Sequence, residues 1–262
     1  MNPKYSIERI ISEGVSLTRR GHSPKPGFRV LSYHAIGENV AFDPKKLFTV
    51  PSELFSKEIE DLRQMKDCYL KEFSLYEFLA SDFKHLNVSL IFDDGYKSVI
   101  KYVVPTLKRF EIPFTVFIST GFIEAGNSEF LSKEDILELS RLDRVKIGSH
   151  GVNHIPLADC TDSQLEYELK ASKVFLEDLI NHQVNTFSYP YGSASPKIKK
   201  GVHEAGYELA LTSRSDINWL DRDPLFLCRT DILAPDSLRT FYQKLCGCWD
   251  WGRWKSPDPA FE

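Results

Sequence analysis

No stretch of the 262-residue sequence reaches 18 consecutive apolar residues, so we expect no membrane-spanning helix. The formal net charge of −4 lacks the excess of basic residues that nucleic-acid-binding proteins carry. The five cysteines are odd in number and scattered, which fits a reducing cytoplasm better than a disulfide scaffold. The first 27 residues show no apolar core and no small-residue cleavage site of a signal peptide. These features favour a cytoplasmic protein without a transmembrane segment and without a nucleic-acid partner.

Short apolar runs alternate with helical patterns along most of the chain. We expect strands at 28–33, 88–92, 114–119, 145–148, 185–189, 207–212 and 225–233. Strands that alternate with helices indicate parallel β-α units, and about seven of them in one chain favour a closed barrel. We therefore expect an N-terminal helix and linker, residues 1–27, followed by one α/β domain, residues 28–262.

Two of the helices have a recognisable start. Thr161 and Gln164 open the segment 161–180 with the spacing of a capping box, in which each side chain bonds the other's backbone N–H. Ser132 and Asp135 have the same spacing at the start of another helical pattern. Both positions are therefore predicted helix N-termini.

Polar and ionisable side chains follow nearly every predicted strand. In a barrel of parallel strands, the chemistry sits at the carboxyl ends of those strands. The residues of interest near these ends are His34, Asp93, Asp94, Gly95, His150, His154, Tyr191 and Trp219. Arg229 lies near the middle of the last predicted strand.

The segment KIGSHGVNHIPL places His150 at a strand end and His154 four residues later. The glycine and asparagine between them favour a tight turn that could bring the two imidazoles together. Two imidazoles and one carboxylate are a common set of zinc ligands, and Asp93 and Asp94 stand after an apolar strand. Each pattern alone has an ordinary alternative, namely unrelated loop histidines and an aspartate that caps a helix.

Four segments together resemble the NodB-homology polysaccharide deacetylases, carbohydrate esterase family four. LIFDDGYKS resembles the T-F-D-D-G motif of this family. SHGVNH resembles the H-[ST]-x-x-H motif, with Gly151 where Ser or Thr is usual. YPYG (189–192) resembles the end of the R-x-P-Y motif, and DINW (216–219) resembles the Asp/Trp motif.

The resemblance extends over about residues 28–235. It implies a distorted (β/α) barrel of about seven strands. It also implies a hydrolase that removes N-acetyl or O-acetyl groups from sugars with the help of a divalent metal.

The resemblance also implies roles for individual residues. Asp94, His150 and His154 would bind the metal, with zinc as the first choice and cobalt, nickel or manganese as alternatives. Asp93 would be the general base of the hydrolysis. The backbone N–H of Tyr191 would stabilise the oxyanion that forms.

Three residues would also contact the substrate. Tyr191 would do so beside the reacting group, while Trp219 and Leu233 would line the pocket for the acetyl methyl group. Aromatic side chains belong to a core just as often, so a place in the core is the alternative interpretation of Trp219.

The sequence departs from the family pattern at two places. Ser188 replaces the arginine that normally orients the base, and we expect Arg229 to reach Asp93 from the last strand instead. A structural ion pair is the alternative reading of Arg229. The late L-x-x-H motif, the usual source of the general acid, is absent, and no histidine follows His203. His34 is the best replacement, although a lone histidine is more often a hydrogen-bonded core residue.

The leading hypothesis is a metal-dependent de-N-acetylase in bacterial surface glycan biosynthesis. Its substrate would be an N-acetylated sugar, as a free, lipid-linked or nucleotide-linked precursor. A different amide or acetyl-ester hydrolase on the same fold is the second hypothesis. A weakly active carbohydrate-binding relative is the third.

Overall fold

The computed structural model describes residues 3–18, 23–255 and 258–260. Within these residues, eight parallel strands form the main sheet. They are β1 (Gly27–Tyr33), β4 (Cys68–Leu70), β5 (Leu86–Phe92), β6 (Phe114–Ile118), β7 (Val145–Ser149), β8 (Thr186–Ser188), β9 (Leu209–Leu211) and β10 (Thr230–Asp231). Seven of them follow one path in the order β10-β1-β5-β6-β7-β8-β9, and β4 pairs with β5 beside that path. The predicted distorted barrel of about seven strands is confirmed.

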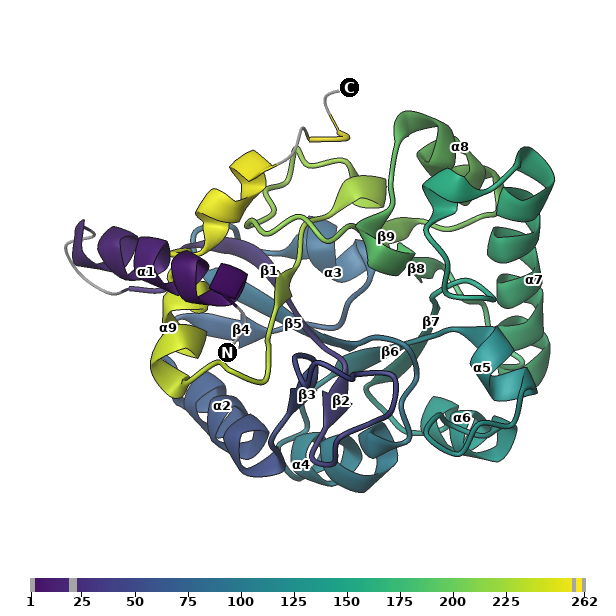
Figure 1. The fold of residues 1–262 in the computed structure, drawn as a ribbon, viewed down its shortest axis with the longest axis horizontal. Coiled ribbons are helices and arrows are strands. Elements are labelled where there is room, and N and C mark those ends of the chain that lie inside the picture. The colour runs from purple at the N-terminus through teal and green to yellow at the C-terminus, as the bar shows by residue number, and fades with distance from the viewer. Residues whose placement is uncertain (1–2, 19–22, 256–257, 261–262) are drawn as a thin grey trace.

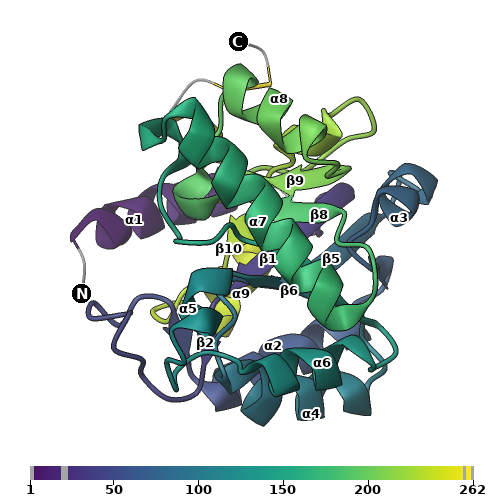
Figure 2. The same cartoon turned by 90° about the vertical axis from the view of Figure 1, so that its right-hand side faces the viewer.

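Helices cover the outside of this curved sheet. The α-helices are α1 (Pro3–Thr18), α2 (Ser52–Gln64), α3 (Leu75–Ala80), α4 (Val104–Arg109), α5 (Thr120–Glu124), α6 (Lys133–Ser140), α7 (Asp162–Ile180), α8 (Pro196–Glu204) and α9 (Leu238–Leu245). Short helical turns are η1 (Val99–Val103), η2 (Leu157–Asp159), η3 (Pro190–Gly192), η4 (Pro224–Phe226) and η5 (Asp250–Lys255). Figure 1 shows α2, α4, α6, α7 and α8 arranged around the sheet, and the turned view in Figure 2 shows α7 across its front.

Local sequence signals explain much of this arrangement. All seven residues of β5 are buried, as expected for a parallel strand that is covered on both faces and reads as an apolar run. The predicted capping boxes are confirmed at the start of α7, with Thr161 and Gln164, and at the start of α6, with Ser132 and Asp135. These capping boxes therefore define where two of the outer helices begin.

The last predicted strand, residues 225–233, is wrong in its extent. Pro224 starts the helical turn η4, and the side chain of Asp223 accepts the Leu225 N–H at 2.8 Å, so the chain begins with a turn. Only β10 is a strand in this segment. Between β9 and β10 the barrel closes through irregular contacts, such as the hydrogen bond from Arg229 N–H to the Arg214 carbonyl at 2.9 Å.

The predicted N-terminal helix is present as α1. Tyr5 is buried, stacks on Trp249 with ring centroids 5.7 Å apart and donates a hydrogen bond to Asp236. Residues 1–2 and 19–22 of the expected helix and linker lie outside the described residues. No helix in the described residues is long and apolar enough to span a membrane.

A small parallel sheet, β2 (Ala35–Ile36) and β3 (Thr49–Val50), was not predicted. The loop between its strands is held by the buried Asp43 carboxylate. This carboxylate accepts the backbone N–H groups of Leu47, Phe48 and Thr49 at 2.8–2.9 Å. The insertion forms one wall of the pocket described below.

Candidate metal centre and active site

Three turns at the carboxyl ends of strands bring the site together. Each contains a non-glycine residue in the left-handed region: Asp94 (φ 70°) after β5, His154 (φ 50°) after β7 and Tyr191 (φ 56°) after β8. Such backbone angles cost free energy and persist only where the surrounding structure enforces them, often at functional sites. Gly95 and Gly192, which follow two of these residues, also have positive φ and allow the sharp exit from the strand.

Asp94, His150 and His154 converge as predicted. One ligand atom from each lies within 4.8 Å of the others. Asp94 Oδ1 is 3.4 Å from His150 Nε2 and 3.1 Å from His154 Nε2. Ligand atoms bound at about 2.0–2.2 Å around a tetrahedral zinc would stand about 3.3–3.6 Å apart. The spacing therefore fits a divalent metal between the three side chains.

The buried oxygen of Asp94 supports the same conclusion. Asp94 Oδ1 is buried and has no hydrogen-bond partner among the described residues, although an imidazole nitrogen of His150 and one of His154 lie 3.4 and 3.1 Å away. Burial alone would raise the pKa of Asp94, but His150 and His154 hold it well below its usual range. An ionised carboxylate oxygen with an unused lone pair in a buried site is a suitable metal ligand.

A second contact fixes the ring of His150. Its Nδ1 lies 2.6 Å from the carbonyl oxygen of Ser188, so Nδ1 carries the proton and donates to that carbonyl. Nε2 is then left with the lone pair that a metal requires, in the direction of Asp94. Metal-binding histidines are generally oriented in this way by a carbonyl or carboxylate on the other ring nitrogen.

Asp93 lies beside the three ligands and is held by Arg229. Arg229 Nη1 donates to Asp93 Oδ2 at 2.5 Å, which confirms the predicted contact. Ser188 Oγ accepts from the same Nη1 at 2.9 Å and donates to Asp93 Oδ2 at 3.2 Å. Arg229 Nε also pairs with Asp231 at 3.2 Å. Asp93 Oδ1 is buried and has no hydrogen-bond partner among the residues that the structure describes.

His34 follows β1 directly and lines the same pocket. Its ring lies 4.7 Å from the ring of Phe48, and its Nδ1 is buried without a hydrogen-bond partner in the part of the chain that the structure describes. A core histidine would normally have both nitrogens satisfied or solvated. His34 therefore shares the pocket with Asp94, His150 and His154.

The pocket has a volume of about 350 Å³ and includes residues that the sequence did not indicate. Its lining residues are His34, Phe42, Asp43, Phe48, Asp94, Tyr96, Phe122, His150, His154, Tyr191, Ser213, Arg229 and Asp231. Phe42 and Tyr191 are more than half exposed, and the Tyr191 ring lies 4.7 Å from that of His154. For the wall that the insertion between β2 and β3 forms, the sequence offers one signal, namely two phenylalanines, Phe42 and Phe48, in the turn-rich segment 37–48.

Two residues predicted to contact the substrate, Trp219 and Leu233, are not among the residues that line this pocket. Trp219 is 43% exposed and lies near Phe83, with ring centroids 6.4 Å apart. Its neighbour Asn218 pairs with Phe28 near the amino end of β1, whereas the site lies at the carboxyl end. Leu233 does not line the pocket either, since it packs against the cluster that contains Tyr5. The pocket instead takes its apolar wall from the insertion between β2 and β3.

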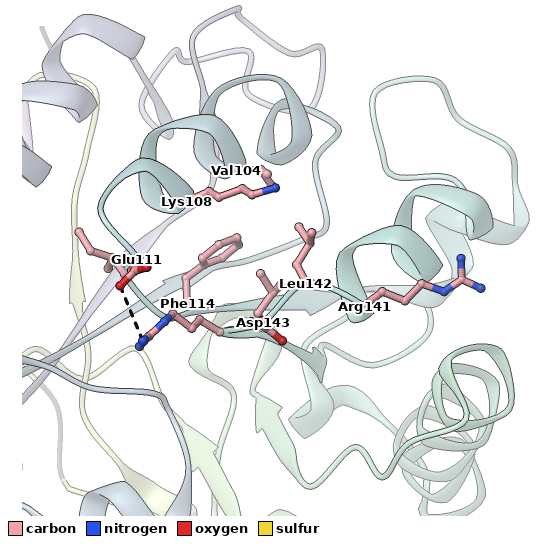
Figure 3. Close-up of a pocket in the computed structure, with 10 residues that line it drawn as sticks. Val104, Lys108, Glu111, Phe114, Arg141, Leu142 and Asp143 are labelled. Carbon is pink, nitrogen blue, oxygen red and sulfur yellow. Dashed lines mark ion pairs between the residues drawn. The ribbon is translucent and has the colours of Figure 1, made fainter.

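A second hollow of about 370 Å³ lies at the amino ends of β6 and β7 (Figure 3). Its charged lining includes Lys108 and Asp143, and Glu111 pairs with Arg144 at 4.0 Å. None of the described residues that line it is a histidine or a cysteine. It therefore offers no ligand set comparable with that of Asp94, His150 and His154.

Comparison with known proteins assigns this site to a family. The family model of polysaccharide deacetylases matches residues 81–210. YxkH of Bacillus subtilis is 29% identical over 187 residues, which cover 70% of this chain and 63% of YxkH. The poly-β-1,6-N-acetyl-D-glucosamine N-deacetylase of Staphylococcus aureus is 26% identical over 197 residues, which cover 68% of each chain. The match thus spans about two thirds of the length of these relatives.

Solved structures share the fold. The Streptococcus pyogenes deacetylase PplD, in complex with acetate, superimposes with a TM-score of 0.74 at 23% identity, over 85% of this chain and 99% of PplD. IcaB from Ammonifex degensii gives a TM-score of 0.72 at 22% identity, over 84% of this chain and 97% of IcaB. These structures show a shared fold, and the match of the family model to residues 81–210, together with the relatives above, identifies the chain as a member of the polysaccharide deacetylase family.

Proposed function

We propose that this protein removes N-acetyl groups from an N-acetylated sugar chain in a reaction that depends on a divalent metal. The observation that carries the proposal is the convergence of Asp94, His150 and His154 beside Asp93, whose orientation is fixed by Arg229. A Staphylococcus aureus relative that is named for deacetylation of poly-β-1,6-N-acetyl-D-glucosamine gives further support. By analogy, the product would be a partly deacetylated surface glycan.

The bound metal would supply Lewis-acid polarisation of the acetyl carbonyl and activation of water. Zinc is the ion we propose, because two imidazoles and one carboxylate are typical of its catalytic sites, with cobalt, nickel or manganese as substitutes. Asp94, His150 and His154 would hold it.

The side chains around the metal site divide the proton transfers between them. Asp93 would take the proton of the attacking water through Oδ1, while Arg229 keeps Oδ2 in place. The backbone N–H of Tyr191 would donate to the oxyanion. His34 would then protonate the sugar nitrogen as the C–N bond breaks, which releases acetate and an amino sugar.

The pocket lining favours an uncharged substrate. Arg229 is the only lysine or arginine among the described residues that line the pocket, and Asp93 and Asp231 both pair with it. A nucleotide-linked or lipid-linked precursor with a diphosphate would find no free cation beside the reacting group. Phe42, Phe48 and Phe122 instead offer apolar faces that suit an acetyl methyl group and the C–H face of a sugar ring.

Acetate release from a panel of substrates tests the proposal. The zinc-loaded protein should act on N-acetylglucosamine oligomers, and less on nucleotide-linked N-acetylhexosamines. A preference for small acetyl esters or other amides would favour the second hypothesis of a different hydrolase. Binding of oligomers without acetate release would favour a carbohydrate-binding protein.

A further inference from the structure

We infer that Glu168, on α7, positions the turn that carries His150 and His154. Glu168 is 1% exposed, and its carboxylate faces this turn. Its Oε2 accepts the backbone N–H of Val152 at 2.7 Å and that of Asn153 at 3.0 Å. Its Oε1 accepts from the side-chain amide of Asn153 at 2.6 Å. One buried carboxylate thus binds two of the three residues between the histidines.

These hydrogen bonds take the place of an ion pair at the buried Glu168 carboxylate. No lysine, arginine or histidine forms an ion pair with Glu168 among the residues that the structure describes. A buried carboxylate is costly unless hydrogen-bond donors surround it, and bonds from N–H groups to an ionised oxygen are stronger than neutral ones. The three N–H groups are therefore both the compensation for burial and a strong constraint on the turn.

The opposite side of the turn is held as well. The carbonyl of Gly151 accepts from Thr120 N–H at 3.1 Å, and the carbonyl of Val152 accepts from Gly121 N–H at 2.8 Å. The turn is thus fixed between the start of α5 and the Glu168 carboxylate. With its backbone held on both sides, the left-handed conformation of His154 is maintained and its Nε2 stays directed towards Asp94.

Glu168 also accounts for the glycine at position 151, where the family pattern has Ser or Thr. A Cβ atom on Gly151 would stand 3.0 Å from Glu168 Oε2, and the φ of 78° disfavours a side chain there. The carboxylate from α7 occupies the space that a residue-151 side chain would take. In this chain the turn is therefore stabilised from the neighbouring helix.

The inference rests on the metal-binding part of the proposed function, so metal affinity is the readout. Zinc is titrated into the metal-free protein by calorimetry, and the visible spectrum of the cobalt-loaded protein reports the arrangement of the ligands. Glu168→Ala should weaken zinc binding about 10- to 100-fold, as loss of a group that orients metal ligands usually does, and should alter the cobalt spectrum. Glu168→Gln keeps one acceptor oxygen, so it should recover part of the affinity.

Glu177→Ala is the matched control. Glu177 lies on the same helix and accepts the backbone N–H of Val184 at 2.9 Å, far along the helix from the turn. This variant should lose some thermal stability without a change in zinc affinity. A general loss of helix packing would affect both variants in the same way.

A folded Glu168→Ala variant with wild-type zinc affinity and an unchanged cobalt spectrum would overturn the inference. If Glu168→Ala does not fold, Glu168→Gln decides: a loss of affinity supports the positioning role, and wild-type affinity refutes it. Failure of the wild-type protein to bind zinc or cobalt would contradict the metal centre itself, and the inference with it.

Discussion

Arg229 Nη1 lies 2.5 Å from Asp93 Oδ2, although 136 positions separate the two residues. The same nitrogen donates to Ser188 Oγ, at the position where the family pattern has its arginine. The small serine side chain leaves room for a guanidinium that enters from beside β10. The positive charge next to the proposed base is thus retained, but it comes from a different segment of the barrel.

Arg229→Lys should lower turnover about 10²-fold while the metal content stays unchanged. A lysine offers one ammonium group and cannot bind Asp93 and Asp231 at once, and a base displaced by about 1 Å can lose this much rate. Steady-state acetate release and metal analysis of the same samples measure both quantities. Arg222→Lys, which alters a pair with Asp258, is the control and should keep full turnover. Undiminished turnover of Arg229→Lys would show that Arg229 has no part in orienting Asp93.

Asp93→Asn and Asp94→Asn should separate the base from the metal ligand. Asp93→Asn removes the proton acceptor and should cost about 10²–10⁴-fold in turnover with the metal retained. Asp94→Asn should weaken metal binding itself, because a neutral amide is a poor substitute for the carboxylate. Metal titration and turnover are compared for the two variants. Near wild-type turnover of Asp93→Asn would exclude it as the base.

Phe42→Ala should raise the KM for N-acetylglucosamine oligomers about 5- to 10-fold with little change in kcat. Phe42 is 52% exposed on the pocket wall and packs against Phe122 with ring centroids 5.2 Å apart. Loss of one aromatic contact with a sugar ring corresponds to about 1 kcal/mol of binding. Tyr76→Ala, on the exposed face of α3, serves as the control. An unchanged KM would exclude Phe42 from the substrate site.

Glu58 should make the stability of the protein fall as pH rises. Burial raises the pKa of Glu58 to about 8, although Tyr33 donates a hydrogen bond to it at 3.1 Å. The unfolded chain loses this proton near its ordinary pKa, so between about pH 4.5 and 8 the folded state binds more protons than the unfolded state. The free energy of unfolding should therefore decrease by up to about 1.4 kcal/mol per pH unit from this group.

Urea unfolding of wild type and Glu58→Gln at several pH values isolates that contribution. The stability of the wild type relative to the variant should decline from pH 5 to pH 7.5. Glu60 is exposed on the same helix, so the free energy of unfolding of Glu60→Gln should change with pH as that of the wild type does. If the free energy of unfolding of Glu58→Gln changes with pH in the same way as that of the wild type, the pKa of Glu58 is not raised in the folded protein.

The parts of the site that the sequence predicted are those encoded within one strand and the turn after it. Asp94 and His150 come just after strand ends and His154 lies in the turn after β7, and parallel strands place such ends together. Arg229 was predicted correctly because the missing charge at Ser188 required a replacement. In each case a local pattern and the barrel topology were sufficient.

The residues that were missed or misplaced depend on contacts between distant segments. Glu168 reads as an ordinary polar residue of α7, and nothing in its neighbourhood indicates that it faces the turn after β7. Trp219 follows β9 in the sequence, but the chain there returns to the amino end of β1 through the pairing of Asn218 with Phe28. Phe42 belongs to the insertion between β2 and β3, and the sequence of this insertion does not indicate that it folds over the site.

Acetate release before and after metal removal tests the proposed metal-dependent deacetylation most directly. The wild-type protein should hold about one divalent ion per chain and release acetate from N-acetylglucosamine oligomers. Treatment with a chelator should abolish this release, and added zinc should restore it. The double variant His150→Ala/His154→Ala should neither hold the ion nor regain activity. Full acetate release by the metal-free protein, or full metal occupancy in the double variant, would contradict the metal centre formed by Asp94, His150 and His154.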